Sequence, residues 1–492
     1  MPLNNDKWFV FHTVPNYTQF HTMGCEIGFC EELEKNAGVK LQHAMLYFAD
    51  NTCKMYFAEN EWREKGKLVF NKIKNEPEYP KTLFKQIRET AATLLKFAKT
   101  IPPAKELPKL TDKELMTLYD NFFKAHNPLW SIGMVQNLPE FENEYVSKYI
   151  LTEITERLRV KTQVKMQPAE VFSLLVTSRE RDVFKQESID MFQLCIDVEN
   201  KKLDLDNAIE AHSKKYYWTQ YNFTGPVLDK NYFKEIAQSI IKQHNAREKL
   251  EELLKEENEL PAKQNELLKS LEFSKEAQHL ISYGRNIGTL KAVRMDPSYF
   301  AYCEMERVLK EIAKRLEISI SQVRSINARF MQKYLLDRNY SENEIPDSYK
   351  HSLNLFQDGK WTFLIGKPAL EEYEKQLKFA RKEEVKNELH GTAAFPGKVT
   401  GKINLIFTVK DLDKMQQGDI LVSPATSPDL VPAMKKAGAI LTDVGGVTCH
   451  AAIISRELKI PCIVGLKSVT RNFKEGDLVE VDANSGIVRK IE

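Results

Sequence analysis

The sequence has few cysteines and no long hydrophobic run. Seven cysteines are scattered over 492 residues between Cys25 and Cys462, an odd and sparse set that favours reduced thiols over a disulfide framework. No apolar run approaches the roughly 18 residues that span a bilayer. The first residues lack the basic-then-apolar layout of a signal peptide. We therefore expect a cytoplasmic protein with no membrane partner.

The chain also lacks an excess of charge of one sign. It carries 71 Lys and Arg against 69 Asp and Glu, a formal net charge of +2, so no overall field favours nucleic acid as a partner. Hydrophobic residues make up 42% and charged residues 28%, which is ordinary for a globular protein and excludes a disordered or collagen-like chain. The length suggests about three domains.

Glycine and tryptophan are distributed unevenly along the chain. Ten of the 20 glycines lie in residues 391–492, and all five tryptophans precede that segment. We therefore place domain boundaries near residues 103 and 390. The predicted fold class is a multidomain protein that combines α/β and mainly α parts. Residues 1–103 are a mixed α/β segment, residues 104–390 a largely helical domain, and residues 391–492 a compact α/β unit.

Local patterns predict several elements before residue 390. Short apolar runs predict strands at 8–11 and 44–48, and a helical pattern covers 81–100. Thr111 and Glu114 match a capping box. Pro128 is expected to end the helix that begins there. The charged stretch 249–276, with Pro261 in its middle, predicts a projecting helical hairpin.

In the last hundred residues, segments with the hydrophobic periodicity of a strand alternate with segments that have the periodicity of a helix. Two helices are predicted, at 428–437 and 449–458. Five short strands are predicted, at 399–406, 419–423, 439–442, 461–464 and 478–482.

The most informative segment is 442–457. A strand ends at Thr442, Gly445 and Gly446 allow a tight turn with close approach of a ligand, and a helix begins near Thr448. His450 is therefore expected in the first helical turn, where free N–H groups and the helix dipole favour an anion.

That placement suggests a nucleophile beside phosphate-binding groups. A neutral imidazole is a nucleophile near neutral pH. Thr448 offers a hydroxyl donor beside it, and Arg456 a cationic partner for phosphate. The arrangement suggests a phosphorylated histidine that divides one transfer into two steps. The residues alone leave this hypothesis open against a helix-cap or core histidine.

Residues 445–457 and 460–465 closely resemble the phosphohistidine signature of the PEP-utilising enzymes, and 395–402 and 476–486 resemble the same mobile domain. The resemblance covers about 391–492 and implies a swivelling β/β/α domain. It implies that His450 carries a phosphoryl group between two distant sites, that Thr448 lies beside it, and that Gly445, Gly446 and Arg456 surround the phosphate.

No segment resembles the ATP-grasp domain that is the phosphoryl donor in this family, and no Walker A loop or C-terminal PEP/pyruvate barrel is recognisable. We therefore expect an ATP-grasp partner to hold ATP and Mg²⁺. The chain itself is expected to have no metal ligands, and residues 1–390 to bind a small-molecule acceptor. Two alternatives stay open: a non-catalytic phosphohistidine relay or regulatory protein, and a complete enzyme with a degenerate nucleotide site within residues 1–390.

Two weaker signals have simpler interpretations. Cys25 and Cys30, near His12, His21 and Cys53, could suggest zinc, but their spacing favours buried free thiols. The second signal is a group of charged residues next to aromatic ones. It could mark an acceptor pocket, but a solvated helix face with salt bridges is the favoured interpretation. It comprises Lys291, Arg294, Glu304 and Arg307, close to Tyr299 and Phe300.

Overall fold

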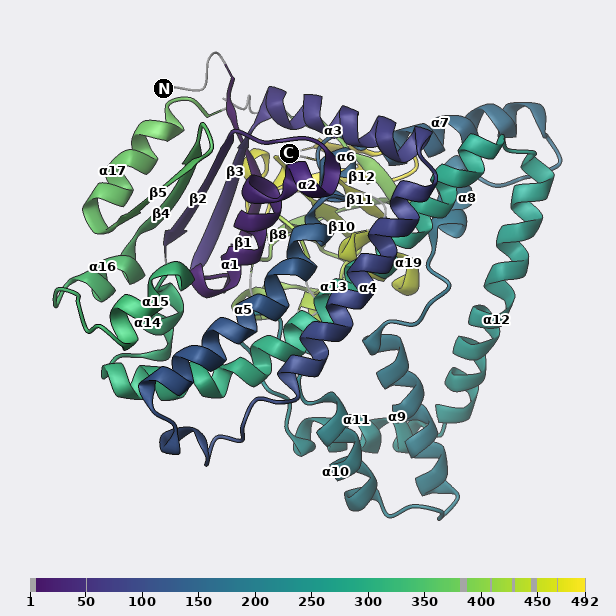
Figure 1. The fold of residues 1–492 in the computed structure, drawn as a ribbon. Coiled ribbons are helices and arrows are strands. Elements are labelled where there is room, and N and C mark those ends of the chain that lie inside the picture. The colour runs from purple at the N-terminus through teal and green to yellow at the C-terminus, as the bar shows by residue number, and fades with distance from the viewer. Residues whose placement is uncertain are drawn as a thin grey trace.

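A computed structural model describes residues 6–49, 51–380, 387–407, 409–426, 430–443, 449–466 and 468–491. It shows two β-sheets and a large body of helices (Figure 1). The predicted combination of α/β and mainly helical parts is confirmed. Within these residues no helix is long and apolar enough to cross a bilayer.

The first sheet is antiparallel, with strand order β1-β3-β2-β4-β5. Its members are β1 (Trp8–Pro15), β2 (His43–Ala49), β3 (Thr52–Ala58), β4 (Ser352–Gln357) and β5 (Lys360–Ile365). The strands predicted at 8–11 and 44–48 are confirmed. The last two strands lie within the stretch expected to be mainly helical. Because β4 pairs with β2, this sheet joins the N-terminal segment to the end of the helical region.

Four long helices form the centre of the body: α3 (Glu59–Asn75), α4 (Glu78–Ala98), α5 (Asp112–Met134) and α13 (Lys275–Leu316). Helix α13 has 42 residues, and an apolar stripe that includes Met305, Leu309 and Ile312 is buried. The capping box is confirmed, since Glu114 N donates to Thr111 Oγ1 over 3.2 Å and Thr111 N donates to Glu114 Oε2 over 2.7 Å.

Two expectations about proline were wrong. Helix α5 continues through Pro128 to Met134, because buried Leu129 and Trp130 pack beyond it and Trp130 Nε1 donates to Ser298 Oγ over 2.9 Å. Residues 249–276 are not a hairpin, because α12 (Ala246–Leu271) runs through Pro261. Proline removes one backbone hydrogen bond, and tertiary packing outweighs that cost where it is extensive.

The remaining helices surround this centre. Helices α9, α10 and α11 form a lobe with its own apolar core, at the lower right of Figure 1, and α12 connects this lobe to the body. The helices are α1 (Gln19–Glu26), α2 (Leu33–Ala37), α6 (Asn137–Glu140), α7 (Tyr145–Val160), α8 (Pro168–Val176), α9 (Val183–Glu199), α10 (Leu205–Tyr216), α11 (Lys230–Gln243), α14 (Ile320–Ser325), α15 (Met331–Leu335), α16 (Glu344–Lys350) and α17 (Gly366–Leu377).

The C-terminal unit is built on an eight-stranded sheet with order β6-β13-β12-β8-β9-β10-β11-β7. Its central strands β8 to β11 pair in parallel and the others antiparallel. All five predicted strands are confirmed, whereas β6, β7 and β13 were not predicted. The elements are β6 (Glu388–His390), β7 (Thr392–Phe395), β8 (Lys398–Leu405), β9 (Ile420–Ser423), α18 (Val431–Met434), β10 (Ala439–Thr442), α19 (His450–Leu458), β11 (Cys462–Val464), α20 (Val469–Asn472), β12 (Leu478–Asp482) and β13 (Ile487–Lys490).

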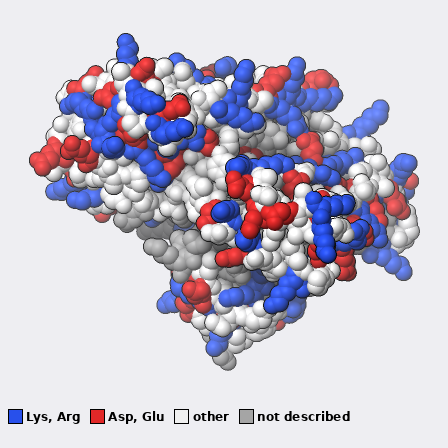
Figure 2. All heavy atoms as spheres, turned by 90° about the horizontal axis from the view of Figure 1, so that it is seen from below, with Lys and Arg blue, Asp and Glu red and all other residues white. Residues whose placement is uncertain are grey.

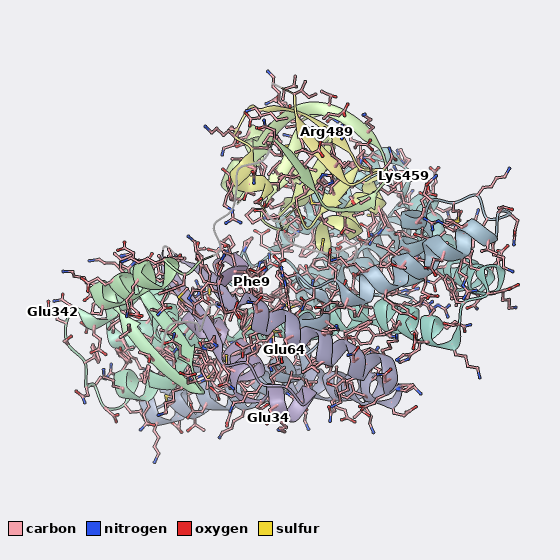
Figure 3. All side chains as sticks on the ribbon, turned by 90° about the horizontal axis from the view of Figure 1, so that it is seen from above. Phe9, Glu34, Glu64, Glu342, Lys459 and Arg489 are labelled. Carbon is pink, nitrogen blue, oxygen red and sulfur yellow. The ribbon has the colours of Figure 1, made fainter. Side chains whose placement is uncertain are left out.

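The C-terminal unit rests on the helical body rather than on the first sheet (Figure 3). Strand β7 lies beside α8, and Thr392 Oγ1 donates to Glu144 Oε1 over 3.0 Å. Buried Ala394, Ala451 and Ala452 belong to the same continuous apolar cluster as the body. The structure therefore places the segment around α19 at a junction between the two parts of the chain.

Candidate functional site

Helix α19 begins at His450, with Cys449 as its N-cap in an extended conformation. The predicted position of His450 in the first helical turn is therefore confirmed by the backbone. Ala451 and Ala452 are buried, and α19 packs on β7, β10 and β11. The His450 side chain and residues 444–448, which include Gly445, Gly446 and Thr448, lie outside the described part of the structure. Their roles stay predictions.

The start of α19 has the chemistry expected for an anion. The first N–H groups of a helix have no partner within it, and the dipole makes that end positive. A neutral imidazole at this position is compatible with that field, and an imidazole bearing a phosphoryl group would be stabilised by it. The backbone therefore suits a phosphohistidine better than a permanent cation.

The strand that leads into this segment is anchored at its carboxyl end. Asp443, directly after β10, is buried and accepts a hydrogen bond from Thr470 N over 3.0 Å and a second from Thr470 Oγ1. Hydrogen bonds to a charged acceptor are among the stronger ones in proteins. Asp443 thus ties the end of β10 to α20, and sequence analysis did not single it out.

The geometry of α19 separates Arg456 from His450. Residues advance about 100° and 1.5 Å each along a helix, so Arg456 lies roughly 9 Å along the axis and about 120° around it. Burial lowers the pKa of Arg456, and the neighbouring thiols of Cys449 and Cys462 partly oppose that shift. Its predicted contact with phosphate stays untested, and the helical geometry favours a role within the C-terminal unit.

A charge of the helical body affects the N-cap residue of α19. Burial raises the pKa of Cys449. The hydrogen bond with the Ala452 backbone and the positive charge of Lys291 on α13 partly offset this rise. Desolvation lowers the pKa of Lys291, although this residue is exposed to solvent. The charge of Lys291 therefore acts on the N-cap residue of the candidate phosphohistidine helix.

Two other charged residues of α13, Arg294 and Glu304, are buried and do not lie on the expected solvated helix face. Arg294 is 5% exposed and Glu304 7% exposed. Arg294 Nη1 donates to Gly133 O over 2.8 Å, and Glu304 pairs with Arg307 over 2.5 Å. The salt-bridge interpretation thus describes Glu304 and Arg307, whereas Arg294 is buried in the core and Lys291 is exposed.

The cysteines suggested for zinc are buried thiols. Cys25, Cys30 and Cys53 are all free and buried, and Cys25 Sγ lies 3.1 Å from Tyr17 Oη. Among the residues that the structure describes, no group of three or more His, Cys, Asp or Glu side chains is arranged to hold a metal ion.

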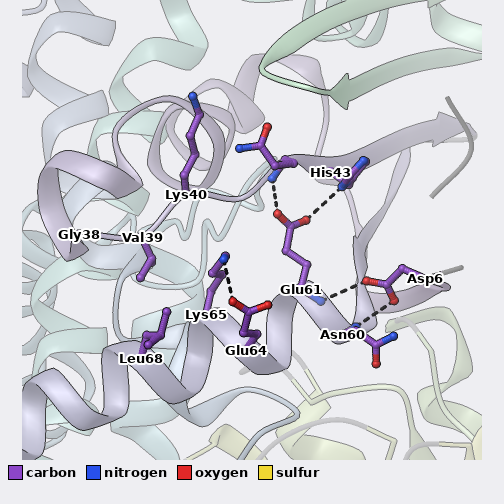
Figure 4. Close-up of a pocket in the computed structure, with 11 residues that line it drawn as sticks. Asp6, Gly38, Val39, Lys40, His43, Asn60, Glu61, Glu64, Lys65 and Leu68 are labelled. Carbon is purple, nitrogen blue, oxygen red and sulfur yellow. Dashed lines mark hydrogen bonds and ion pairs between the residues drawn. The ribbon is translucent and has the colours of Figure 1, made fainter. Parts of the chain in front are cut away.

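A surface hollow of about 490 Å³ lies on the N-terminal part, between the end of α2 and α3 (Figure 4). Its polar groups bind one another: Glu61 accepts from Gln42 N over 2.6 Å and faces His43 Nδ1 at 3.3 Å, and Asp6 accepts from Asn60 N over 2.9 Å. Because these groups already have hydrogen-bond partners, they are not available to bind a ligand in the hollow. Figure 2 shows Lys and Arg intermixed with Asp and Glu over the described residues of the face seen from below.

Comparison with known proteins identifies the C-terminal segment. Residues 415–486 match the family described as PEP-utilising enzyme, mobile domain. This segment is a PEP-utilising enzyme mobile domain. It contains β9, β10, α19, β11 and β12, so α19 and His450 lie inside the matched domain.

The relatives carry the name phosphoenolpyruvate synthase. A probable phosphoenolpyruvate synthase of Archaeoglobus fulgidus is 34% identical over 212 residues, 39% of this chain and 28% of that protein. One of Methanothermobacter thermautotrophicus is 54% identical over 98 residues, 20% of this chain and 14% of that protein. The phosphoenolpyruvate synthase of Pyrococcus furiosus is 52% identical over 108 residues, 22% of this chain and 13% of that protein. The chain thus spans less than a third of the length of each of these relatives.

The solved structures that resemble this chain have TM-scores too low to support a fold assignment. The holo-form aconitase X of Thermococcus kodakaraensis is 24% identical over 21% of this chain and 98% of that chain, with a TM-score of 0.18. An Enzyme I structure is 18% identical over 63% of this chain and 81% of that chain, with a TM-score of 0.17.

Proposed function

We propose that this chain is a phosphotransferase component in which His450 carries a phosphoryl group from a nucleotide site to an acceptor bound by residues 1–390. The observation that carries the proposal is the position of His450 as the first residue of α19 within a PEP-utilising enzyme mobile domain. The relatives named phosphoenolpyruvate synthase support phosphoryl transfer as the reaction class.

The proposed chemistry has two displacements. In the first, the neutral imidazole of His450 attacks the β-phosphorus of ATP, a P–N bond forms, and the P–O bond to AMP breaks. Before the second, water displaces the γ-phosphoryl group as inorganic phosphate, which leaves the β-phosphoryl group on His450. In the second, an acceptor oxygen attacks the same phosphorus, the P–N bond breaks, and the acceptor proton passes to the released imidazole. Positioning and charge neutralisation do most of the work in such transfers.

The proposed donor is a separate ATP-grasp partner, which would hold ATP and Mg²⁺. Movement of the C-terminal unit between that partner and the body would connect the two steps. The junction seen here, with Thr392 bound to Glu144 and with Ala451 and Ala452 in the apolar cluster of the body, fits the acceptor-side position of such a movement.

Labelled ATP tests the proposal. The purified chain is incubated with ATP labelled at the β-phosphorus, with and without extract from its own cells. We expect acid-labile label that requires both the extract and His450. Label without extract would instead indicate a nucleotide site within residues 1–390.

Two variants control for other histidines and for folding. His450→Ala should lose the label. His390→Ala should keep it, because His390 lies exposed on β6 of the same unit and pairs with Glu388 over 2.8 Å. Full labelling of His450→Ala would contradict the proposal.

A further inference from the structure

The two outer strands of the first sheet differ in how their free edges are protected. Strands β1 and β5 stand at opposite ends of the strand order (Figure 1). The edge of β1 is covered, because Trp8 N donates to Phe379 O over 3.1 Å and Trp8 forms a parallel bridge with Ala380. Strand β1 also has a register shift between Val10 and His12. Coverage and bulges are devices that prevent the edge of one sheet from pairing with another.

Among the described residues, nothing comparable protects β5. It ends the strand order, so no other described strand pairs with its outer side. Its pairing with β4 is continuous from Lys360 to Ile365, and the strand contains no proline. Its one charged residue, Lys360, lies at the first position. A strand of aromatic and β-branched residues with a single charge is a favourable template for a further strand.

The hydrogen-bond pattern shows which backbone groups of β5 point to the free side. Gly366 N donates to His351 O over 2.8 Å, and these two residues continue the register of β5 with β4. Bonded and non-bonded pairs alternate along an antiparallel ladder. Every second residue before Gly366 therefore also bonds to β4, and the residues between them have N–H and C=O groups that point away from β4. These residues are Trp361, Phe363 and Ile365.

Aromatic side chains accompany these free backbone groups. The rings of Trp361 and Phe363 are stacked with their centroids 5.8 Å apart. Phe330, which is 39% exposed, packs edge-on against Phe363 at 5.3 Å. Trp361 Nε1 donates to Glu31 Oε1 over 3.0 Å, which fixes the indole ring. A partly exposed aromatic patch of this kind is typical of an interface.

We propose that β5 pairs antiparallel with β5 of a second copy of this chain, so that the two first sheets form one sheet of ten strands. A register centred on Phe363 lets all three residues with free backbone groups bond across the interface. It places Phe363 opposite its own copy and Trp361 opposite Ile365, and such aromatic and β-branched pairs are favourable across strands. Lys360 lies opposite Gly366 in this register, so no like charges face each other.

The two edges also determine the size of the assembly. Pairing of β5 with itself is isologous and uses the free edge of both chains. The opposite edge of each sheet is covered at Trp8, so the sheet does not extend further. A dimer rather than a filament follows. Its interface belongs to the first sheet and not to the C-terminal unit, so the proposal is independent of phosphorylation at His450.

The mass of the full chain in solution tests the proposal. Size-exclusion chromatography with light scattering should give twice the 56.9 kDa of one chain, with dissociation on dilution. Thr362 is exposed on β5 and would lie diagonally opposite its own copy across the two-fold axis. Thr362→Lys should therefore raise the dissociation constant about fivefold or more, because it places like charges close together.

Thr400→Lys is the matched control. Thr400 is exposed on β8 of the other sheet and lies opposite Glu480, so the same exchange is tolerated there. It should leave the dissociation constant unchanged within about twofold. Circular dichroism of each variant shows whether the fold is retained.

Phe363→Cys tests the register. Opposed residues of a bonded pair have Cα atoms about 5.5 Å apart, within the range of a disulfide. Oxidation with copper phenanthroline should join Phe363→Cys chains into a covalent dimer. Thr362→Cys is the control, because diagonal residues lie about 7–8 Å apart and are beyond that range. The unmodified chain is the blank for the seven native cysteines.

Three results would overturn the proposal. The first is a chain that has the mass of a monomer at every concentration. The second is a dimer that Thr362→Lys affects no more than Thr400→Lys. The third is equal cross-linking of Phe363→Cys and Thr362→Cys.

Discussion

Thr392 on β7 donates its hydroxyl hydrogen to Glu144 between α6 and α7, over 3.0 Å from Oγ1 to Oε1. This bond links the mobile domain side of the chain to the helical body. Glu144 also pairs with Lys148 over 3.2 Å, so its carboxylate is oriented before the C-terminal unit contacts it. In the proposed movement of the C-terminal unit, this partly buried hydrogen bond would stabilise the position seen in the structure.

Thr392→Val tests that interpretation. The loss of a hydrogen bond to a charged acceptor should cost about 1–2 kcal/mol of docking free energy, which shifts the docked-to-undocked ratio by roughly tenfold. Small-angle X-ray scattering should then show a larger radius of gyration. Thr400→Val is the control, because Thr400 is exposed on β8 of the same unit. An unchanged radius in Thr392→Val, or an equal change in the control, would show that this bond does not hold the junction.

Asp443→Ala should destabilise the C-terminal unit. The change removes a buried carboxylate that accepts two hydrogen bonds from Thr470, and we expect the free energy of unfolding to fall by about 2–3 kcal/mol. Urea denaturation measures this loss. Labelling of His450 should fall as well, because the end of β10 that leads to α19 would no longer be anchored. Unchanged stability would show that the two bonds contribute little.

The C-terminal elements could be predicted from sequence because local patterns and tertiary packing agree there. Alternating strands, small residues on α19 and a recognisable signature gave the five strands and the start of α19. The strands β4 and β5 could not be predicted in the same way. Strand β4 pairs with β2 across about three hundred residues, and no local pattern encodes that partner. Strand β5 pairs with β4, so its place in the sheet depends on β4. The predictions at Pro128 and Pro261 were wrong for a related reason. Tertiary packing outweighed the local tendency of proline to end a helix.

Gly133→Ala should displace the buried side chain of Arg294. A Cβ at Gly133 would lie 2.6 Å from Cδ of Arg294, so Arg294 would have to move and its bond to Gly133 O would weaken. We expect a loss of about 1–3 kcal/mol in the free energy of unfolding, measured with urea. Gly288→Ala on α13 is the control, because nothing lies within 4 Å of its added Cβ. That change should be neutral or stabilising by up to about 1 kcal/mol. Equal effects of the two changes would contradict the packing described here.

Asp296 should make stability depend on pH. Burial, and then the charge of Asp182, raise the pKa of the Asp296 carboxyl to about 7, although it accepts a hydrogen bond from Val183 N over 3.3 Å. In the unfolded chain this carboxyl has its ordinary pKa near 3.8. Because the folded pKa is higher, the stabilisation is complete below about pH 4 and is lost as the pH rises to about 7.

Asp296→Asn isolates that contribution. Relative to the unmodified chain, the variant should gain stability as the pH rises from 5 to 8, since an amide does not ionise. Urea denaturation at pH 5, 6, 7 and 8 gives the difference at each pH, and this removes the contribution of other groups such as Glu140. A difference that does not change with pH would show that Asp296 titrates normally.

Only part of the candidate site could be predicted from the sequence. The position of His450 followed from the glycine pair and the helix start that surround it. Lys291 and His12 were each noticed, but one as a member of a charged helix face and the other as a neighbour of cysteines. The charge of Lys291 on α13 affects the pKa of His12 on β1, and no local pattern relates two elements so far apart in the sequence.

The most direct test of the central claim is the site of phosphorylation. After incubation with ATP and cell extract, peptide mapping under non-acidic conditions should place one added phosphoryl group on the peptide that contains His450, and mild acid should remove it. The His390→Ala chain should give the same map. An unmodified His450 peptide under conditions that transfer phosphoryl groups to other residues of the chain would contradict the account.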